Sequence, residues 1–372
     1  MKKKMSKTEK RKRIRRRRKK RVLFLVVELV VLAVLGVIAY GMLKIDKLNI
    51  NFLDSDKLEA YHDTGEYTNI ALFGVDSREG QLDGGTQSDC IMIASISNET
   101  NEVKLVSVYR DTLLQQADGT YEKANSAYNT GGPQDAVSLL NRNFDLDIQN
   151  YVSVDFAALV EAIDLLGGID LDMTAEEVKY CNQYAFETAV VSGKSYEVME
   201  EKDGVQHVDG VHAVGYARIR YTDGNDFKRA ERQREVLQLV VQKAQQADLG
   251  TLNKIVDTVF PMISTSLTLQ DMLGFAAHAL DYKIVETSGF PYRVTTDENV
   301  LNHTGSYVVP IGLGSNVTEL HQRLFQETDY QPSEKVQQIN DDIIYLTGIT
   351  EDAEALETTF DADVSEDSGD TE

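Results

Sequence analysis

The sequence has few of the residues that form disulfide frameworks or metal-binding clusters. Its 372 residues include only two cysteines, Cys90 and Cys181, and the six histidines lack the spacing of metal ligands. Two cysteines can form one disulfide in an exported domain, but they cannot form a disulfide framework. We favour the alternative that both are buried free thiols.

Motifs of several common enzyme classes are also absent. There is no G-x-S-x-G nucleophile elbow, no P-loop and no H-E-x-x-H zinc motif. The motif Gly312-Leu313-Gly314 is too short to be a dinucleotide fingerprint. The remaining candidates for chemistry are Asp and Arg residues near the ends of predicted strands.

The charge is distributed very unevenly along the chain. The formal net charge is −22, yet residues 1–21 contain fifteen Lys or Arg and one Glu, which leaves −36 for the other 351 residues. An acidic body with a short basic tail is not the profile of a nucleic-acid-binding protein, so we expect no nucleic-acid partner. The tail is typical of a charged arm beside a membrane.

A long apolar segment follows the basic tail. Val22–Met42 contains 21 residues with one charge, Glu28, and a helix of this length spans about 31 Å, the thickness of a hydrocarbon core. It is too long for a cleavable signal peptide and has a poor cleavage site. The flanking cations predict a retained single-pass anchor with a cytoplasmic N-terminus and an extracytoplasmic C-terminal body.

The body alternates short β-branched runs with amphipathic stretches. Strands are predicted at Thr68–Val75, Cys90–Ser97, Val103–Tyr109 and Ile169–Leu171, and helices at Pro133–Phe144, Phe156–Leu166, Asp226–Ala247 and Gln270–Tyr282. This alternation predicts an α/β fold, an α/β/α sandwich with a mixed central sheet.

The predicted domain organisation has five parts. We expect a basic cytoplasmic tail (1–21), an anchor (22–42), an extracytoplasmic stalk (43–67), a catalytic domain (68–327) and an acidic, largely disordered tail (328–372). The last 22 residues contain ten Asp or Glu and no Lys or Arg, and such a segment cannot bury enough apolar surface to fold alone.

Two Asp residues lie at the ends of neighbouring predicted strands. Asp76 closes the first strand and Asp89 opens the second, so the two carboxylates are expected at one edge of the sheet. Mg²⁺ is commonly held by one or two carboxylates together with substrate phosphates. The alternative is that both residues cap or stabilise turns.

Several Arg residues are expected to converge near the same edge. Arg110 follows the third strand, and Arg218 and Arg220 have the i, i+2 spacing that places two side chains on one face of an extended segment. Arg229, Arg232 and Gln233 share a side of a helix that begins near Asp226. Guanidinium groups bind phosphate in a bidentate manner, although structural salt bridges with the many acidic residues are the alternative.

Seven segments, in this order and spacing, resemble the LytR-CpsA-Psr family. They are Asn69–Arg78 (NIALFGVDSR), Ser88-Asp89, Lys104–Thr112 (KLVSVYRDT), Lys123–Tyr128 (KANSAY), Gly131-Gly132-Pro133, Gly167–Asp172 (GGIDLD) and Asp209–Gln233 (DGVHAVGYARIRYTDGNDFKRAERQ). The resemblance covers about half of the chain. The N-terminal anchor and external body also follow the layout of the family.

The resemblance implies a Mg²⁺-dependent phosphotransferase at the surface of a Gram-positive-type bacterium. It would transfer a teichoic acid or capsular polysaccharide from undecaprenyl pyrophosphate to a peptidoglycan hydroxyl and release polyprenyl phosphate. Asp76 and Asp89 would hold the metal, and Arg110, Arg218, Arg220 and Arg229 would bind the pyrophosphate. Gln233 and Asp226 would shape that site.

The lipid part of such a donor requires an apolar channel, and the segments Phe156–Leu166 and Val236–Val256 are candidates for its walls. Two alternatives stay open. One is a membrane-bound envelope regulator that attenuates transcription without catalysis. The other is a hydrolase of the same donor, with water in place of the acceptor hydroxyl.

Overall fold

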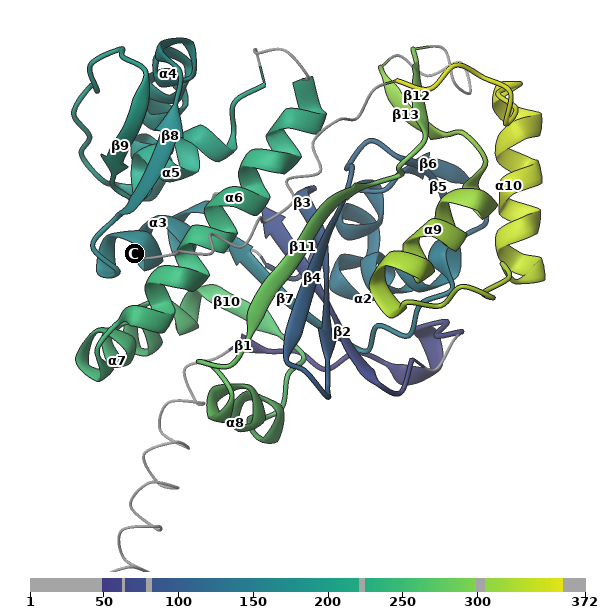
Figure 1. Cartoon of the computed structure of the whole chain (residues 1–372), viewed down its shortest axis with the longest axis horizontal. Coiled ribbons are helices and arrows are strands. Elements are labelled where there is room, and N and C mark those ends of the chain that lie inside the picture. Colours follow the sequence, from purple (N-terminus) through teal and green to yellow (C-terminus); the bar gives the residue numbers. More distant parts are fainter. Residues whose placement is uncertain (1–48, 62–63, 78–81, 221–224, 299–304, 357–372) are drawn as a thin grey trace, which may run out of the picture. The chain divides into compact units, whose positions relative to one another are not determined.

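The computed structural model describes residues 49–61, 64–77, 82–220, 225–298 and 305–356 (Figure 1). The predicted basic tail and the predicted anchor, Val22–Met42, lie outside these ranges. In the described part of the chain, no helix combines the length and the apolar character needed to cross a membrane.

A seven-stranded mixed sheet forms the centre of the fold. Its strand order is β1-β10-β7-β2-β3-β4-β11, with the antiparallel pairs β2–β3, β3–β4 and β10–β7 and the parallel pairs β2–β7, β4–β11 and β1–β10. The strands are β1 (Asn49–Ile50), β2 (Tyr67–Val75), β3 (Ser88–Ser97), β4 (Glu102–Val108), β7 (Asn150–Asp155), β10 (Ile263–Thr265) and β11 (Lys283–Phe290).

Three further pairs of strands lie outside the central sheet. They are β5 (Leu113–Gln115) with β6 (Tyr121–Lys123), β8 (Ile169–Met173) with β9 (Gly204–Val208), and β12 (Val294–Asp297) with β13 (Tyr307–Pro310). The helices are α2 (Ser126–Phe144), α3 (Phe156–Leu165), α4 (Ala175–Ser192), α5 (Gly210–Ala217), α6 (Asn225–Gln246), α7 (Leu249–Thr258), α8 (Leu269–Ala277), α9 (Leu313–Phe325) and α10 (Glu334–Thr347), with 3₁₀ turns at Ser55–Lys57 and Phe260–Met262.

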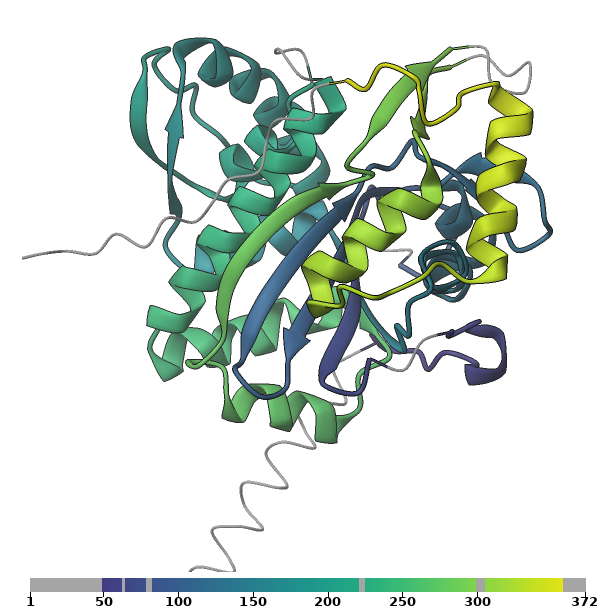
Figure 2. The same ribbon diagram turned by 45° about the vertical axis from the view of Figure 1, so that its right-hand side comes forward.

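Helices cover both faces of the sheet, because its central strands carry apolar side chains on both faces. On one face, Phe73 and Val75 of β2 pack in the main core with residues of α2, α9 and α10. On the other face, Leu72 of β2 packs in a smaller core with Leu237 of α6. Figures 1 and 2 show α6 and α9 on opposite sides of the sheet. The predicted α/β fold with a mixed central sheet is therefore confirmed.

Helices α4 and α5 and the β8–β9 pair form a separate cluster beside the sheet. Their core includes Ile169, Leu171, Val178 and Ala213, and Thr174 and Glu177 form a capping box at the start of α4. Cys181 belongs to this core, and its thiol donates a hydrogen bond to the carbonyl of His212 at 3.2 Å. Both cysteines are free thiols, as expected, but Cys181 is buried whereas Cys90 is only partly buried.

The predicted boundary at residue 328 is wrong. Helix α10 buries Val336, Ile339 and Ile343 against the main core, because these residues have the i, i+3, i+7 spacing of an amphipathic helix. Asp145, at the end of α2, accepts hydrogen bonds from the backbone and hydroxyl of Ser333 at 2.8 and 2.7 Å. The fold therefore includes α10, and only residues 357–372 of the expected tail lie outside the described residues.

The expected stalk also needs correction from residue 49 onward. Leu58 is buried in the main core, and strand β1 pairs with β10 of the central sheet. The guanidinium of Arg142, on α2, forms an ion pair with Glu59. Residues 49–61 therefore pack onto the domain, since Leu58 and the partly buried Leu53 join its core.

Candidate functional site

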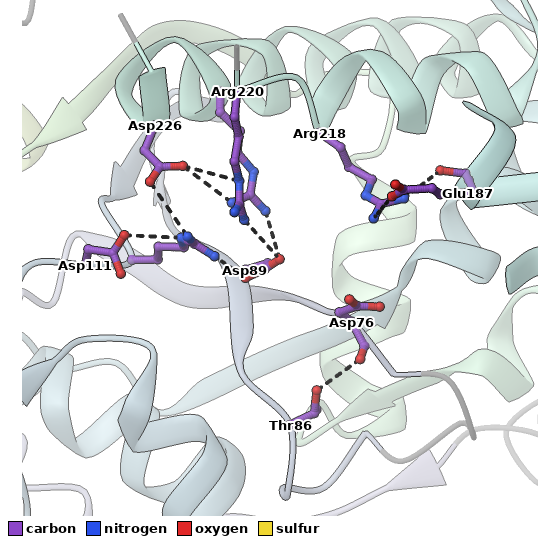
Figure 3. Close-up of polar contacts among 11 residues, drawn as sticks. Asp76, Thr86, Asp89, Asp111, Glu187, Arg218, Arg220 and Asp226 are labelled. Carbon is purple, nitrogen blue, oxygen red and sulfur yellow. Dashed lines mark hydrogen bonds and ion pairs between the residues drawn. The ribbon is translucent and has the colours of Figure 1, made fainter. Parts of the chain in front are cut away.

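The predicted site residues lie at one end of three adjacent strands and at the start of α6. Asp76 directly follows β2, Asp89 is the second residue of β3, and Arg110 lies two residues after β4. Because β2 and β4 both run antiparallel to β3, the ends of β2 and β4 lie beside the start of β3. The first turns of α6 reach the same end of the sheet (Figure 3).

A β-bulge directs the side chain of Asp89. Gly74 pairs with Cys90 and Val75 pairs with Ser88, so Asp89 is an extra residue in β3. Regular alternation would direct its side chain into the core beneath α2. Gly74 permits the close approach of the strands, since a Cβ there would lie 2.8 Å from the Cβ of Cys90.

Three guanidinium groups surround the carboxylate of Asp89. Its Oδ1 accepts a hydrogen bond from Nη1 of Arg110 at 2.8 Å, and its Oδ2 lies 3.0 Å from Nη2 of Arg229 and 3.7 Å from Nη2 of Arg220. Burial alone would raise the pKa of Asp89, but the positive charges of Arg229 and Arg110 outweigh it and hold the pKa below its usual value. Asp89 is therefore ionised at neutral pH.

Asp226 makes longer contacts with the same three arginines. Its carboxylate oxygens lie 3.5 Å from Nε of Arg220 and 3.7 Å from Nη1 of Arg229 and Nη2 of Arg110. It lies in the first turn of α6, where a carboxylate also interacts favourably with the helix dipole. Figure 3 shows Asp226 and Asp89 on either side of Arg220.

Two donor groups of the buried Arg229 side chain make no hydrogen bond within the described residues. These groups are Nε and Nη1, and the side chain is 4% exposed. Burial and the charges of Arg229 and Arg110 also lower the pKa of Arg220. Together with Lys123, which pairs with Asp111, the three arginines carry one more charge than the three carboxylates of Asp89, Asp226 and Asp111, and this end of the sheet suits an added anion.

Arg218 does not join this cluster. The prediction that Arg218 and Arg220 share a face of an extended segment is wrong, because α5 continues to Ala217 and Arg218 caps it with helical dihedral angles. The guanidinium of Arg218 instead donates a hydrogen bond to Thr188 at 3.0 Å and pairs with Glu187 at 3.2 Å. Figure 3 shows it beside Glu187, apart from Arg220.

Arg232 is also directed elsewhere. Its Nη2 lies 2.8 Å from Glu177 of α4, and its Nη1 donates to the carbonyl of Ile219. A residue three positions from Arg229 is rotated by about 60° around the helix axis, which is enough to direct Arg232 toward α4. The helical spacing predicted a shared side, but neighbouring elements separate the two arginines.

An apolar cavity of about 190 Å³ lies between the sheet and the helices α3, α5 and α6. Its walls include Phe156 and Leu159 of α3 and Val236 and Leu237 of α6, which belong to the two segments that we expect to line a lipid channel. An engineered cavity of about 150 Å³ is large enough to bind benzene. This cavity can therefore hold a short apolar segment.

Gln233 and Cys90 connect the apolar cavity with the charged cluster. Both residues line that cavity and also a space of about 20 Å³ bounded by Asp89, Arg110 and Arg229. Gln233 lies one helical turn after Arg229, so it is placed between the two environments. The site thus has an apolar compartment beside a compartment that favours an anion.

The two carboxylates proposed as metal ligands are at the same edge but differ in their surroundings. The backbone carbonyl of Asp76 accepts a hydrogen bond from Thr86 at 3.1 Å, and Figure 3 shows its carboxylate separated from the arginine cluster. Within the described ranges, no group of three or more His, Cys, Asp or Glu is arranged to hold a metal. Mg²⁺ is commonly held by one or two carboxylates together with phosphate oxygens and water, so the role of Asp76 and Asp89 as its ligands stays a prediction.

Sequence reasoning assigned no role to Asp111 and Lys123. Asp111 contacts Nε of Arg110 at 3.4 Å, and its other oxygen lies 3.1 Å from Nζ of Lys123. Lys123 also lies over the ring of Tyr307 at 4.9 Å. The adjacency of Arg110 and Asp111 in the sequence was a signal for the contact between them. The contact between Asp111 and Lys123 depends on the β5–β6 pair, which sequence patterns did not reveal.

Comparison with known proteins provides a family match. The chain matches the LytR_cpsA_psr family over residues 39–322. Among curated relatives, polyisoprenyl-teichoic acid–peptidoglycan teichoic acid transferases named TagU from Halalkalibacterium halodurans and Enterococcus faecalis are 31% and 29% identical. The matches cover 55% and 62% of this chain, and 62% and 70% of those relatives. The first match thus spans less than two thirds of that relative.

The fold also resembles solved structures. The crystal structure of protein gbs0355 from Streptococcus agalactiae is 22% identical and superposes with a TM-score of 0.57. The similarity covers 73% of this chain and 92% of that structure. At this level of identity, the superposition supports the fold and no finer property.

Proposed function

Because the chain belongs to the LytR_cpsA_psr family, we propose that it transfers a glycopolymer from a polyprenyl-pyrophosphate carrier to a hydroxyl group of peptidoglycan. The proposed polymer is of the teichoic acid or capsular polysaccharide type, and the proposed carrier is undecaprenyl pyrophosphate. The names of the TagU relatives support the reaction and the acceptor.

One observation carries the proposal, namely the junction of the apolar cavity with the arginine cluster. Gln233 and Cys90 line both compartments, so an apolar chain in the cavity would place an attached pyrophosphate near Arg229 and Arg110. The unsatisfied Nε and Nη1 donors of Arg229 support this placement, because buried donors are normally paired. A soluble substrate would need no such apolar compartment.

In the proposed reaction, an acceptor hydroxyl attacks the phosphorus on the sugar side of the pyrophosphate. A new O–P bond joins the glycan phosphate to peptidoglycan, the bridging P–O bond breaks, and polyprenyl phosphate leaves. Arg110, Arg220 and Arg229 would neutralise the charge on the transferred and departing phosphates, and charge stabilisation of this type dominates phosphoryl transfer.

The hydroxyl proton requires an acceptor. Asp89 is a weak candidate, because its two oxygens contact guanidinium groups and its pKa is lowered. Asp76 is the better candidate, since it lies at the same edge outside that cluster and could accept the proton on the oxygen that does not contact the metal. The proposed Mg²⁺ would be held by Asp76 and Asp89 with donor phosphate oxygens, and it would supply further charge neutralisation.

The proposed location is the outer face of the cell membrane. The predicted anchor, Val22–Met42, and the fifteen cations before it support an N-terminus in the cytoplasm and a catalytic domain outside. This location would give the domain access to both a lipid-linked donor and the cell wall.

The proposal is tested with the full chain reconstituted in proteoliposomes that contain a radiolabelled polyprenyl-pyrophosphate glycan. We expect Mg²⁺-dependent transfer of label to insoluble peptidoglycan, strong loss of transfer in Asp76→Asn, and normal transfer in the exposed control Asp352→Asn. Release of label as soluble glycan phosphate, with none on peptidoglycan, would instead identify a hydrolase. Intact donor after incubation with every acceptor would refute catalysis.

A further inference from the structure

Helices α7 and α8 have an unusual environment for helices of a folded domain. Neither helix contains a buried residue. Leu249, Leu273 and Leu280 are 85%, 58% and 75% exposed. Leu273 lies on α8, and Leu280 lies three residues after the end of this helix. Ala276 and Ala277, the last two residues of α8, are also exposed. Large exposed apolar patches mark surfaces that contact another molecule or a membrane.

The surface is held in a defined position in spite of its exposure. Thr268 and Asp271 form a capping box at the start of α8. The side chain of Gln245, near the end of α6, donates to the carbonyls of Ala279 and Tyr282 at 3.0 and 2.9 Å. The ring of Phe275 packs against Tyr282 with 6.3 Å between centroids. The exposed leucines are therefore part of a fixed surface.

The same region has little charge in a strongly acidic protein. Residues 248–281 contain five charged side chains, Asp248, Lys254, Asp257, Asp271 and Asp281, although charged residues make up 26% of the whole chain. At that average, about nine charged residues would be expected in 34. Since anionic headgroups repel an acidic protein surface, a sparsely charged face is the one that can approach a bilayer.

Helix α8 lies close to the point where the described chain begins. Strand β10 lies between α7 and α8 in sequence, and it pairs with β1 at Asn49 and Ile50. Figures 1 and 2 show α8 close to β1 at one end of the sheet. Only six residues separate Asn49 from the predicted membrane segment that ends at Met42. Even fully extended, this connection spans about 25 Å.

From these observations, we propose that α7 and α8 form a docking surface that rests on the outer surface of the lipid bilayer. Leu249, Leu273 and Leu280 enter the boundary between headgroups and acyl chains, as the apolar side of an interfacial helix does. Helix α7 packs against α3, whose residues Phe156 and Leu159 line the apolar cavity. The docked domain therefore keeps this wall of the cavity close to the bilayer.

Tryptophan fluorescence tests the proposal directly, because the chain contains no Trp. Leu280→Trp and Leu249→Trp each introduce a single reporter in the full chain, reconstituted in vesicles of phosphatidylcholine and phosphatidylglycerol. Tyr345→Trp is the matched control, since Tyr345 lies on α10 and is 89% exposed. The emission is compared between vesicles with ordinary lipid and with phosphatidylcholine brominated on its acyl chains.

We expect bromine to quench most of the emission of Leu280→Trp and Leu249→Trp and to leave Tyr345→Trp unchanged. Equal, weak quenching at all three positions would overturn the proposal. Emission that shifts with the protein-to-lipid ratio but is not quenched by bromine would also overturn it, and would indicate contact with a second copy of the chain. The assay contains no glycan donor, so its result is independent of whether the protein is a transferase.

Discussion

Replacement of Arg229 by Ala tests whether this arginine binds the substrate or only stabilises the fold. Arg229 is buried and lies 3.0 Å from Asp89, but Asp89 keeps its hydrogen bond to Arg110 at 2.8 Å when Arg229 is removed. The substitution also eliminates two buried donors that have no hydrogen-bond partner within the described residues. We therefore expect the free energy of unfolding to change by only about 1 kcal/mol.

The expected loss of activity is much larger. If Arg229 binds a pyrophosphate oxygen, its removal costs about 2.7–4 kcal/mol of transition-state stabilisation, or roughly 10²–10³ in rate. Arg229→Lys should restore only part of this loss, because an ammonium group cannot reproduce a planar bidentate contact. The rate of glycan transfer and the free energy of unfolding are measured on the same samples.

Arg232→Ala is the matched control, one turn away on the same helix. Arg232 pairs with Glu177 at 2.8 Å, and both side chains are largely buried. Its removal leaves the carboxylate of Glu177 with hydrogen bonds from Thr174 but without a paired charge, which costs about 3–5 kcal/mol of stability, while transfer by the remaining folded protein should persist. The reasoning is refuted if Arg229→Ala destabilises the protein as much as Arg232→Ala and still binds and transfers the donor normally.

Two further predictions concern the cavity and the buried pair. Val154→Phe places a larger side chain in the apolar cavity and should raise the KM for the polyprenyl donor at least about tenfold, whereas an unchanged KM would exclude the cavity as the lipid site. Burial alone would raise the pKa of Glu177, but hydrogen bonds from Thr174 and the charge of Arg232 lower it below the ordinary value of 4.5. A lowered pKa contributes stability above pH 4.5 that is lost as the pH falls through the folded-state pKa, so urea unfolding from pH 7 to 3 should show a steeper loss for the native protein than for Glu177→Gln.

The central strands and the longest helices could be predicted because their apolar residues are numerous and regularly spaced. The runs ending at Val75 and beginning at Cys90 match β2 and β3 within two residues. Helix α6 matches the predicted span within one residue at each end. In these segments, local propensity and burial in the domain favour the same structure.

The missed features depend on contacts between distant segments. The bulge at Asp89 depends on the pairing of β3 with β2, and no local pattern of β3 encodes it. The i, i+2 argument for Arg218 failed because it assumed extended backbone where α5 is capped. Helix α10 was missed because the disordered tail predicted from the acidic final residues was extended too far toward the N-terminus. The spacing of Val336, Ile339 and Ile343 was a signal for a helix.

The shared lining of the two compartments has a consequence for inhibitor design. If the arginines bind the donor phosphates as proposed, a compound with only a diphosphate group would contact them but gain nothing from the apolar cavity. A simple detergent would fill the cavity and leave the donors of Arg229 unpaired. Because Gln233 and Cys90 border both spaces, a compact amphiphile with an anionic head and a short branched tail should bind more tightly than either fragment.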